Sequence, residues 1–247
     1  MGVYLDENIE IVENYPSIYI KNLDLIVISD LQLGEELYLA EKRGIFIPQR
    51  QLEEMKNDVK GIYEKTKAKR LLINGDLKHE FGEASKQEWR EVIDFVENAR
   101  KYFKEIIVVR GNHDNYLLNI ASKIGLEINF PYYKEKEFLF THGHLKIKLK
   151  KDVKYLIIGH EQPAIVLREK YRKIKVPCLI FGKYKNIKLI CLPAFSPLSS
   201  GTEINIVSKE ELLSPILKDS DIDEFEVYGI DKEAGIIKFP ALKFLRF

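Results

Sequence analysis

Residues 106–114 read Ile106-Ile107-Val108-Val109-Arg110-Gly111-Asn112-His113-Asp114, and four other parts of the chain repeat their layout. The apolar run predicts a buried strand, and Gly111 lets the backbone turn sharply where that strand ends. Asn112 then offers an amide oxygen, His113 an imidazole and Asp114 a carboxylate. In an open α/β sheet, binding and catalytic groups gather at the carboxyl ends of strands. The stretch therefore predicts a functional site at one edge of a sheet.

The four other stretches also place residues that can bind metal directly after an apolar run. Their tails are Asp30-Leu31-Gln32, Gly75-Asp76, His142-Gly143-His144 and Gly159-His160-Glu161-Gln162. Four of the five histidines in the chain lie in the five tails. Chance would not gather them in this way, so we expect these side chains to meet in one site.

In this order, the five tails resemble the signature of the calcineurin-like metallophosphoesterases. That signature runs Asp-x-His, Gly-Asp, Gly-Asn-His-(Asp/Glu), His and Gly-His-x-His, and five ordered blocks are far more specific than any single one. The sequence is most similar to the small prokaryotic branch that includes the DNA-ligase-associated type. This wider resemblance extends through residues 30–34, 44–48, 159–163 and 192–197, and it covers roughly residues 20–200.

The resemblance implies an α/β fold, a four-layer α/β/β/α sandwich with two mixed β-sheets. We expect a single domain over residues 1–247, in which residues 201–247 complete or cap the second sheet. Apolar periodicity and turn residues predict helices at 48–67, 85–103, 116–123 and 209–217. They predict strands within 17–29 and at 71–73, 106–109, 137–141, 155–158, 177–182, 187–192, 224–229 and 235–245. Loops at 34–47, 78–86 and 193–201 are expected to shape the site.

The resemblance also implies a dinuclear metal centre. Two divalent ions about 3.5–4 Å apart can bridge an attacking hydroxide and neutralise the charge that develops on phosphorus. The implied metal ligands are Asp30, Asp76, Asn112, His142 and His160. Asp76 would bridge both ions, and Asp30 would serve the ion that His142 does not. His113 would be the general acid for the leaving oxygen or a phosphate ligand, and Asp114 would orient it.

Two residues depart from the signature on the same half of this centre. Gln32 replaces the histidine of Asp-x-His, and Gln162 replaces the second histidine of Gly-His-x-His. A glutamine oxygen is a harder and weaker donor than imidazole, and oxygen-rich shells favour Mg²⁺ or Mn²⁺ over Zn²⁺. We therefore expect Mn²⁺, with Mg²⁺ or Fe as alternatives. The metal site that contains Asp30 is expected to bind its ion weakly, or only when substrate is present. The alternative is that both glutamines line this site without touching metal.

Three further residues are candidates for contact with substrate. His144 would orient a ligand or the phosphate, and simple packing is the alternative. His79 would lie at the rim of the cleft, with a solvated loop position as the alternative. Arg110 could reach a phosphate, although an ordinary surface ion pair is the simpler interpretation.

Composition and charge limit the class of protein and its partners. The net charge of +1 is unlike that of a general nucleic-acid binder, but residues 144–175 carry ten Lys or Arg against three acidic residues. This basic segment could guide a nucleic acid to the metals. No apolar run approaches a membrane span and no signal peptide is recognised, so we expect a cytoplasmic protein without a membrane partner. Cys178 and Cys191 are expected to be buried thiols.

These observations predict a metal-dependent phosphoesterase. A phosphodiester is favoured over a monoester because of the branch resemblance and the local basic segment. Two alternatives stay open: a Mn²⁺-dependent nuclease acting on DNA or RNA, and a degenerate member that holds one metal and acts as a binding protein. Retention of His113 opposes the second alternative, because a binding protein needs no general acid.

Overall fold

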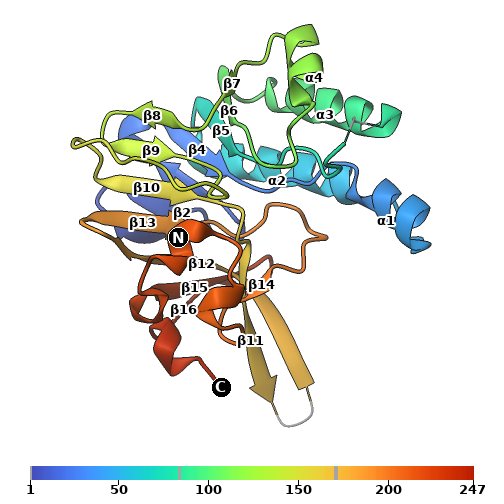
Figure 1. Ribbon diagram of the computed structural model, residues 1–247. Coiled ribbons are helices and arrows are strands. Elements are labelled where there is room, and N and C mark those ends of the chain that lie inside the picture. The colour runs from blue at the N-terminus through green and yellow to red at the C-terminus, as the bar shows by residue number, and fades with distance from the viewer. Residues whose placement is uncertain (1, 83–84, 170–171) are drawn as a thin grey trace.

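The strand before the central motif belongs to the first of two packed β-sheets in the computed structural model, which describes residues 2–82, 85–169 and 172–247 (Figure 1). The sheet orders its strands as in the chain: β1 (Val3–Asp6), β2 (Ile9–Ile11), β3 (Ile18–Ile20), β4 (Leu25–Ile28), β5 (Arg70–Asn74), β6 (Glu105–Val109) and β7 (Ile128–Asn129). The strands β1 to β4 pair antiparallel, and β4 to β7 pair in parallel. Ile28, Ile73 and Val108 are register partners, so three motif-bearing strands end at one edge.

The second sheet supplies the other two motifs. Its main order is β14 (Thr202–Glu203), β11 (Pro163–Glu169), β12 (Arg172–Tyr184), β13 (Ile187–Cys191), β10 (Tyr155–Ile158), β9 (Phe138–Phe140) and β8 (Tyr133–Glu135). The strand β15 (Glu226–Asp231) pairs with β12, and β16 (Gly235–Phe239) pairs with β15. The central strands β9, β10 and β13 are parallel, so the tails after β9 and β10 also share an edge.

Three apolar cores hold the layers together. The first lies between one face of the first sheet and the helices α2 (Gln51–Thr66), α3 (Lys86–Ala99) and α4 (Leu117–Lys123). The second lies between the two sheets, and the third covers the outer face of the second sheet. Figure 1 shows these helices on one side of the sandwich and the C-terminal segment on the other. The predicted α/β class with two mixed sheets is confirmed.

The fourth layer contains less helix than expected. Among the described residues it holds one four-residue helix, α5 (Pro215–Lys218), together with the 3-10 turns η2 (Lys209–Glu211), η3 (Ile222–Glu224) and η4 (Leu242–Phe244). The continuous helix predicted at 209–217 is wrong because Pro215 forces the preceding Ser214 into an extended conformation, with ψ of 120°. The strand predicted at 235–245 ends at Phe239, directly before Pro240.

Other boundaries differ in ways that bear on the site. Residues 34–47 are not only a loop, because α1 (Glu35–Arg43) lies within them. The helix predicted to open at Pro48 begins at Gln51. The strands β1, β2 and β11 had no counterpart in the prediction, and β12 begins at Arg172 rather than at residue 177. No helix of the described chain is both long and apolar enough to cross a bilayer.

Asn74 links the two sheets directly below the site. Its side chain is fully buried, and its amide nitrogen donates to the carbonyls of Thr141 at 3.0 Å and Ile157 at 3.2 Å in the second sheet. Its own carbonyl accepts from Ser29 and lies 3.0 Å from Nδ1 of His142. Asn74 therefore connects both sheets to a motif histidine.

Replacing Asn74 by leucine is expected to lower the free energy of unfolding by roughly 1–3 kcal/mol, because Asn74→Leu removes two buried hydrogen bonds between the sheets. Urea denaturation followed by circular dichroism measures the change. As a control, Asn186→Leu in the exposed β12–β13 turn is expected to shift it by less than about 0.5 kcal/mol. Equal effects at both positions would contradict a special role for Asn74.

Candidate metal centre and active site

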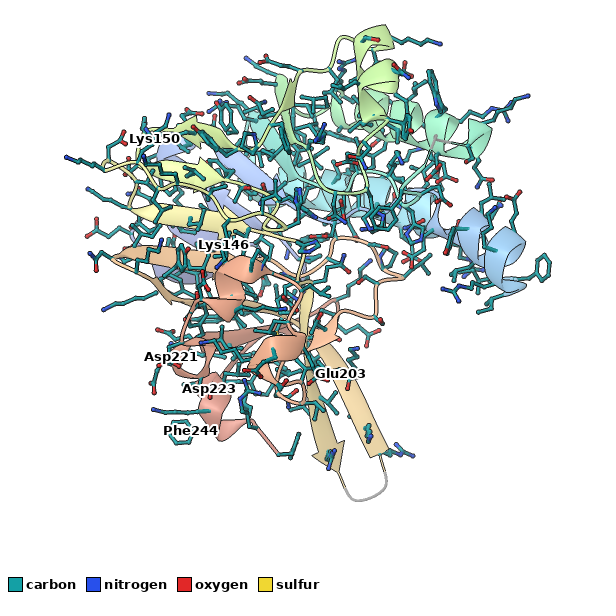
Figure 2. All side chains as sticks on the ribbon, in the orientation of Figure 1. Lys146, Lys150, Glu203, Asp221, Asp223 and Phe244 are labelled. Atoms are coloured by element: carbon teal, nitrogen blue, oxygen red, sulfur yellow. The ribbon has the colours of Figure 1, made fainter. Side chains whose placement is uncertain are left out.

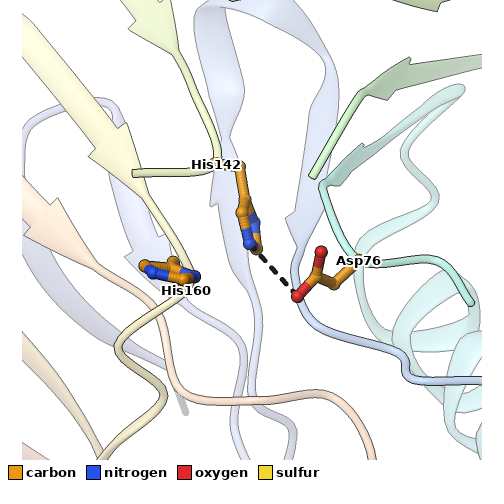
Figure 3. A group of neighbouring side chains, drawn as sticks. All are labelled: Asp76, His142 and His160. Carbon is orange, nitrogen blue, oxygen red and sulfur yellow. Dashed lines mark ion pairs between the residues drawn. The ribbon is translucent and has the colours of Figure 1, made fainter. Parts of the chain in front are cut away.

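Four residues predicted to bind metal converge where the two sheets meet. The ligand atoms of Asp76, His142 and His160 all lie within 4.8 Å of one another (Figure 3). Nε2 of His142 lies 3.2 Å from Oδ2 of Asp76 and 3.1 Å from Oδ1 of Asn112. One carboxylate oxygen, one amide oxygen and two imidazoles form a donor set that suits a divalent transition metal. We refer to these four residues as the metal cluster.

The backbone at the site adopts an uncommon conformation. Five residues from the predicted tails have left-handed φ values between 50° and 64°, and they are Asp30, Gln32, Asp76, His160 and Gln162. Non-glycine residues rarely adopt this region, and such strain gathers at functional sites. Tight turns of this kind point successive polar side chains toward a common centre, which explains why residues from three separate tails meet.

The motif glycines are required by close approach of neighbouring motifs. A Cβ at Gly111 would lie 2.1 Å from Oδ1 of Asp76, and a Cβ at Gly159 would lie 2.5 Å from Oδ2 of Asp30. Each glycine therefore makes room for a carboxylate that belongs to a different tail. This is a packing reason for the Gly-Asn-His-Asp and Gly-His motifs that the order of residues alone does not reveal.

Opposite charges already pair inside the metal cluster. Burial acts to lower the pKa of His142, but the carboxylates of Asp76 and Asp30 outweigh it and raise the pKa to about 10. Burial likewise acts to raise the pKa of Asp76, whereas His142 and His113 hold it well below its usual range. The imidazolium thus provides the positive charge that this carboxylate requires. A bound divalent cation would replace that proton, since a metal ligand must be deprotonated.

Asp30 lies beside the metal cluster and is bonded by neutral donors. It is fully buried. Its Oδ2 accepts from Ser29 at 2.6 Å and from the backbone N–H of His160 at 3.1 Å, and its Oδ1 accepts from Gln162. Burial is the main reason that the pKa of Asp30 rises to about 6. The charge of His142 and the hydrogen bonds from Ser29 and Gln162 oppose that rise.

The two glutamines direct amide N–H groups at the site carboxylates. Nε2 of Gln32 donates to Oδ2 of Asp76 at 2.9 Å, and Nε2 of Gln162 donates to Oδ1 of Asp30 at 3.0 Å. Their oxygens point elsewhere, toward Nδ1 of His79 at 2.9 Å and the hydroxyl of Ser199 at 2.5 Å. Both glutamines therefore line the site as donors to carboxylates.

His113 lies at the edge of the metal cluster. Its Nε2 is 3.8 Å from Oδ2 of Asp76, and its Nδ1 faces the backbone carbonyl of His79. The ring of Phe81 lies 3.6 Å from the His113 ring, centroid to centroid, and Phe81 is 54% exposed. His113 is therefore oriented by a carbonyl on one side and covered by an aromatic ring on its face.

The expectation that Asp114 orients His113 is wrong. Oδ1 of Asp114 accepts from the backbone N–H groups of Leu77 and Lys78, and Oδ2 accepts from that of Gly111. The fully buried carboxylate thereby fixes the turn after β5 against the turn after β6. Both oxygens of the residue next to His113 are therefore bonded to backbone groups and not to the imidazole.

The other predicted residues separate into two groups. His144 lies 5.4 Å from His142 and 5.9 Å from His160 between ring centroids, so it belongs to the metal-cluster side. His79 contacts Gln32 and Tyr38 and supports His113 through its carbonyl. Both have pKa values lowered to about 4, mainly by burial, so both imidazoles are neutral near pH 7. Cys178 and Cys191 are free and buried, as expected.

Sequence reasoning missed several residues that build the site. Asn74 joins the sheets beneath it. Gln51 donates to the carbonyls of Leu31 and Gln32. Glu161 is fully buried and accepts from the backbone of residues 213 and 214, which fixes the C-terminal segment to the Gly-His motif. The signal available for Glu161 was its place between two motif residues, where a charged side chain needs a specific partner.

The fold and the metal cluster together define a metal-dependent phosphoesterase. The sequence model of the calcineurin-like phosphoesterase family matches residues 23–223, and the chain belongs to that family. It is therefore an enzyme that hydrolyses phosphate esters, as the sequence predicted. Among curated protein sequences, none matches this chain.

The chain was also compared with solved structures. Pseudomonas putida nuclease MPE is 17% identical, with a TM-score of 0.64 over 97% of this chain and 99% of that chain. The phosphoesterase Yfce from E. coli is 16% identical, with a TM-score of 0.42 over 88% of this chain and 98% of that one. The likeness to MPE supports the sandwich fold.

Proposed function

We propose that this protein is a metal-dependent phosphodiesterase. The observation that carries the proposal is the convergence of Asp76, Asn112, His142 and His160 on one point, with His113 beside them. A bound divalent metal would supply hydroxide at neutral pH and would neutralise charge on the phosphate. No other group of three or more potential ligands of this kind was found among the described residues.

Two neighbouring residues hold His113 in the orientation that a proton donor needs. The carbonyl of His79 accepts the proton of Nδ1 in His113, which leaves Nε2 to face the metal cluster. Nε2 is therefore the atom that carries a proton to the leaving oxygen. Asp76 accepts the backbone N–H of His113 at 3.0 Å, so the general acid and the metal ligand are fixed to each other.

We further propose that the centre takes two divalent ions, most suitably Mn²⁺, and that the second is the weaker. The weaker position is the one beside Asp30. An ion there must displace the N–H groups that Gln32 and Gln162 direct at the carboxylates, or both amides must rotate to present oxygen. Either change costs hydrogen bonds to charged groups, about 1.5–3 kcal/mol each. Oxygen donors would then favour Mn²⁺ or Mg²⁺ over Zn²⁺.

The test is hydrolysis of an aryl phosphodiester by metal-stripped protein. Activity is expected to appear when Mn²⁺ is added and to be absent in Asn112→Ala, which lacks the amide oxygen beside His142. Asn119→Ala, at an exposed position of α4, is the matched control and is expected to keep wild-type activity. Absence of turnover in the wild-type protein, with tight binding of one metal, would favour the one-metal binding protein instead.

A second candidate function is a nuclease acting on DNA or RNA. It is favoured by the lysine-rich stretch that follows His144 and by the nuclease activity of the similarly folded MPE. The two functions differ in salt dependence. Cleavage of a long polyanion should weaken steeply as salt is added, whereas hydrolysis of a small cyclic diester should respond little.

A further inference from the structure

The basic segment 144–175 is divided between two places in the fold. Its second half forms the hairpin of β11 and β12, which projects from the sandwich (Figure 1). Lys170 and Tyr171 of that hairpin lie outside the described residues. Its first half, residues 145–151, links β9 to β10 and starts directly after His144. Both halves begin at the metal site, because β11 directly follows Gln162, but the first half is the one that lines a groove.

Residues 145–151 alternate between apolar and basic side chains, reading Leu-Lys-Ile-Lys-Leu-Lys-Lys. Ile147 and Leu149 pack against the third apolar core, while Lys146, Lys148 and Lys150 are exposed. The core thus holds alternate residues and leaves the lysines between them exposed, as a row along the sequence.

The positive charge of this row is largely uncompensated. Lys146 forms an ion pair with Asp219 at 2.6 Å. Within residues 2–82, 85–169 and 172–247, Lys148, Lys150 and Lys151 form no ion pair. Figure 2 labels Lys146 and Lys150 on this loop. A row of exposed lysines attracts a ligand whose negative charges also repeat along a chain.

Aromatic residues form the opposite side of a groove beside the lysines. Phe130, Pro131 and Tyr132 line this groove together with residues 145–151. Phe130 is 48% exposed, and Nζ of Lys150 lies 5.3 Å from the ring centroid of Tyr132. An exposed ring such as that of Phe130 can stack on a nucleobase of any sequence, and lysines contact phosphates. The groove therefore offers both kinds of contact that a nucleic acid strand needs.

Arg110 and Thr141 contact the aromatic side of the groove and lie close in sequence to residues of the metal cluster. The guanidinium of Arg110, two residues before Asn112, lies 3.9 Å from the ring centroid of Phe130. The Thr141 hydroxyl donates to the carbonyl of Pro131 at 2.9 Å, directly before His142. Nε of Arg110 and Nδ1 of His144 are buried and have no hydrogen-bond partner in the described part of the chain. The surface ion pair expected for Arg110 is not formed among those residues.

We propose that the groove between residues 130–132 and 145–151 binds single-stranded nucleic acid and guides it past Arg110 to the metal cluster. The inference rests on the proposed phosphodiesterase function and names its substrate class. A single strand is required because its bases are free to stack, whereas those of a duplex are already stacked on each other. Arg110 and His144 would then hold the phosphate next to the one under attack.

The test measures binding of fluorescent single-stranded oligonucleotides, one of DNA and one of RNA, by full-length protein across a salt series. Lys148→Ala/Lys150→Ala is expected to weaken binding about tenfold. It is also expected to reduce the slope of log K against log salt by about 1.4, since each phosphate contact on a single strand contributes about 0.7. The matched control is Lys101→Ala/Lys104→Ala, two exposed lysines that lie before β6, at the end opposite to its motif.

A second variant separates stacking from charge. Phe130→Ala is expected to weaken oligonucleotide binding at least fivefold without changing the salt slope, because stacking involves no counterion release. Circular dichroism checks that each variant folds. Unchanged oligonucleotide affinity in both variants, or equal losses in the control pair, would overturn the inference.

Hydrolysis of the aryl phosphodiester separates this inference from the proposed function. The Lys148→Ala/Lys150→Ala variant is expected to keep wild-type activity on that small substrate, because both lysines lie outside the metal cluster. Oligonucleotide binding that depends on the groove, with no aryl hydrolysis by wild-type protein, would remove the phosphodiesterase proposal and leave the binding surface. Aryl hydrolysis by the wild-type protein, together with oligonucleotide binding that the groove variants do not weaken, would keep the phosphodiesterase proposal and remove the binding surface.

Discussion

Asp76→Asn is expected to lower kcat/KM for Mn²⁺-dependent phosphodiester hydrolysis by at least about a thousandfold, equivalent to ~4 kcal/mol of lost transition-state stabilisation. The carboxylate lies within the metal cluster and contacts His142, Gln32 and the backbone of His113. The amide keeps the size of the side chain and one oxygen acceptor but loses the negative charge that a cation requires. The value of kcat/KM should therefore fall sharply while the protein stays folded.

Bound metal and activity are measured on the same preparations. Metal analysis after gel filtration should show loss of Mn²⁺ from Asp76→Asn, and its far-ultraviolet circular dichroism should match that of the wild type. Asp94→Asn is the matched control, because Asp94 is an exposed residue of α3 that pairs with Lys56. A variant at position 76 that retained activity within tenfold would exclude Asp76 from the metal centre.

The sequence predicted the position of the site because apolar strands and their tails are local signals. Runs such as residues 106–109 are buried on both faces, so they are continuous in apolar residues and easy to recognise. Parallel pairing then places their ends at one edge, and the order of the tails matched a known signature. The convergence of the candidate metal ligands thus followed from strand burial and register.

One hairpin of the second sheet was not predicted. The strand β11 and the first residues of β12 form a hairpin that pairs Arg168 with Lys173 and Glu169 with Arg172, so no apolar alternation marks its outer part. The helix predicted at 209–217 failed for a different reason. There the apolar spacing suggested a helix, and the conformation required before a proline prevailed.

Side-chain direction within the tails also could not be predicted. Asp114 follows His113 in sequence but bonds to backbone groups in another tail. The glutamine amides point as they do because Gln32 and Gln162 are in left-handed turns, with φ of 52° and 50°. Residue types and spacing define which groups are present at a site. The turn conformations decide which of them contact each other.

The Gln32→His/Gln162→His variant is expected to bind a second Mn²⁺ at least about a hundredfold more tightly than the wild type, equivalent to ~2.7 kcal/mol. In the wild type, amide N–H groups occupy Asp76 and Asp30. An imidazole in place of each amide removes a hydrogen bond that an incoming ion must break, and it adds a nitrogen lone pair that binds the ion directly. Both effects favour the second ion.

Two readouts distinguish this result from a general change in the protein. Titration calorimetry on metal-stripped protein should resolve a second binding step in the double variant, and electron paramagnetic resonance should detect coupling between two nearby Mn²⁺ ions. The variant should also shift its preference toward Zn²⁺, because nitrogen donors replace oxygen. Gln87→His on α3 is the control and should leave the stoichiometry unchanged. If the double variant bound the second ion no more tightly than the wild type, the two glutamines would not be what weakens this half of the centre. The neutral donors from Ser29 and His160 to Asp30 would then limit the affinity for the second ion.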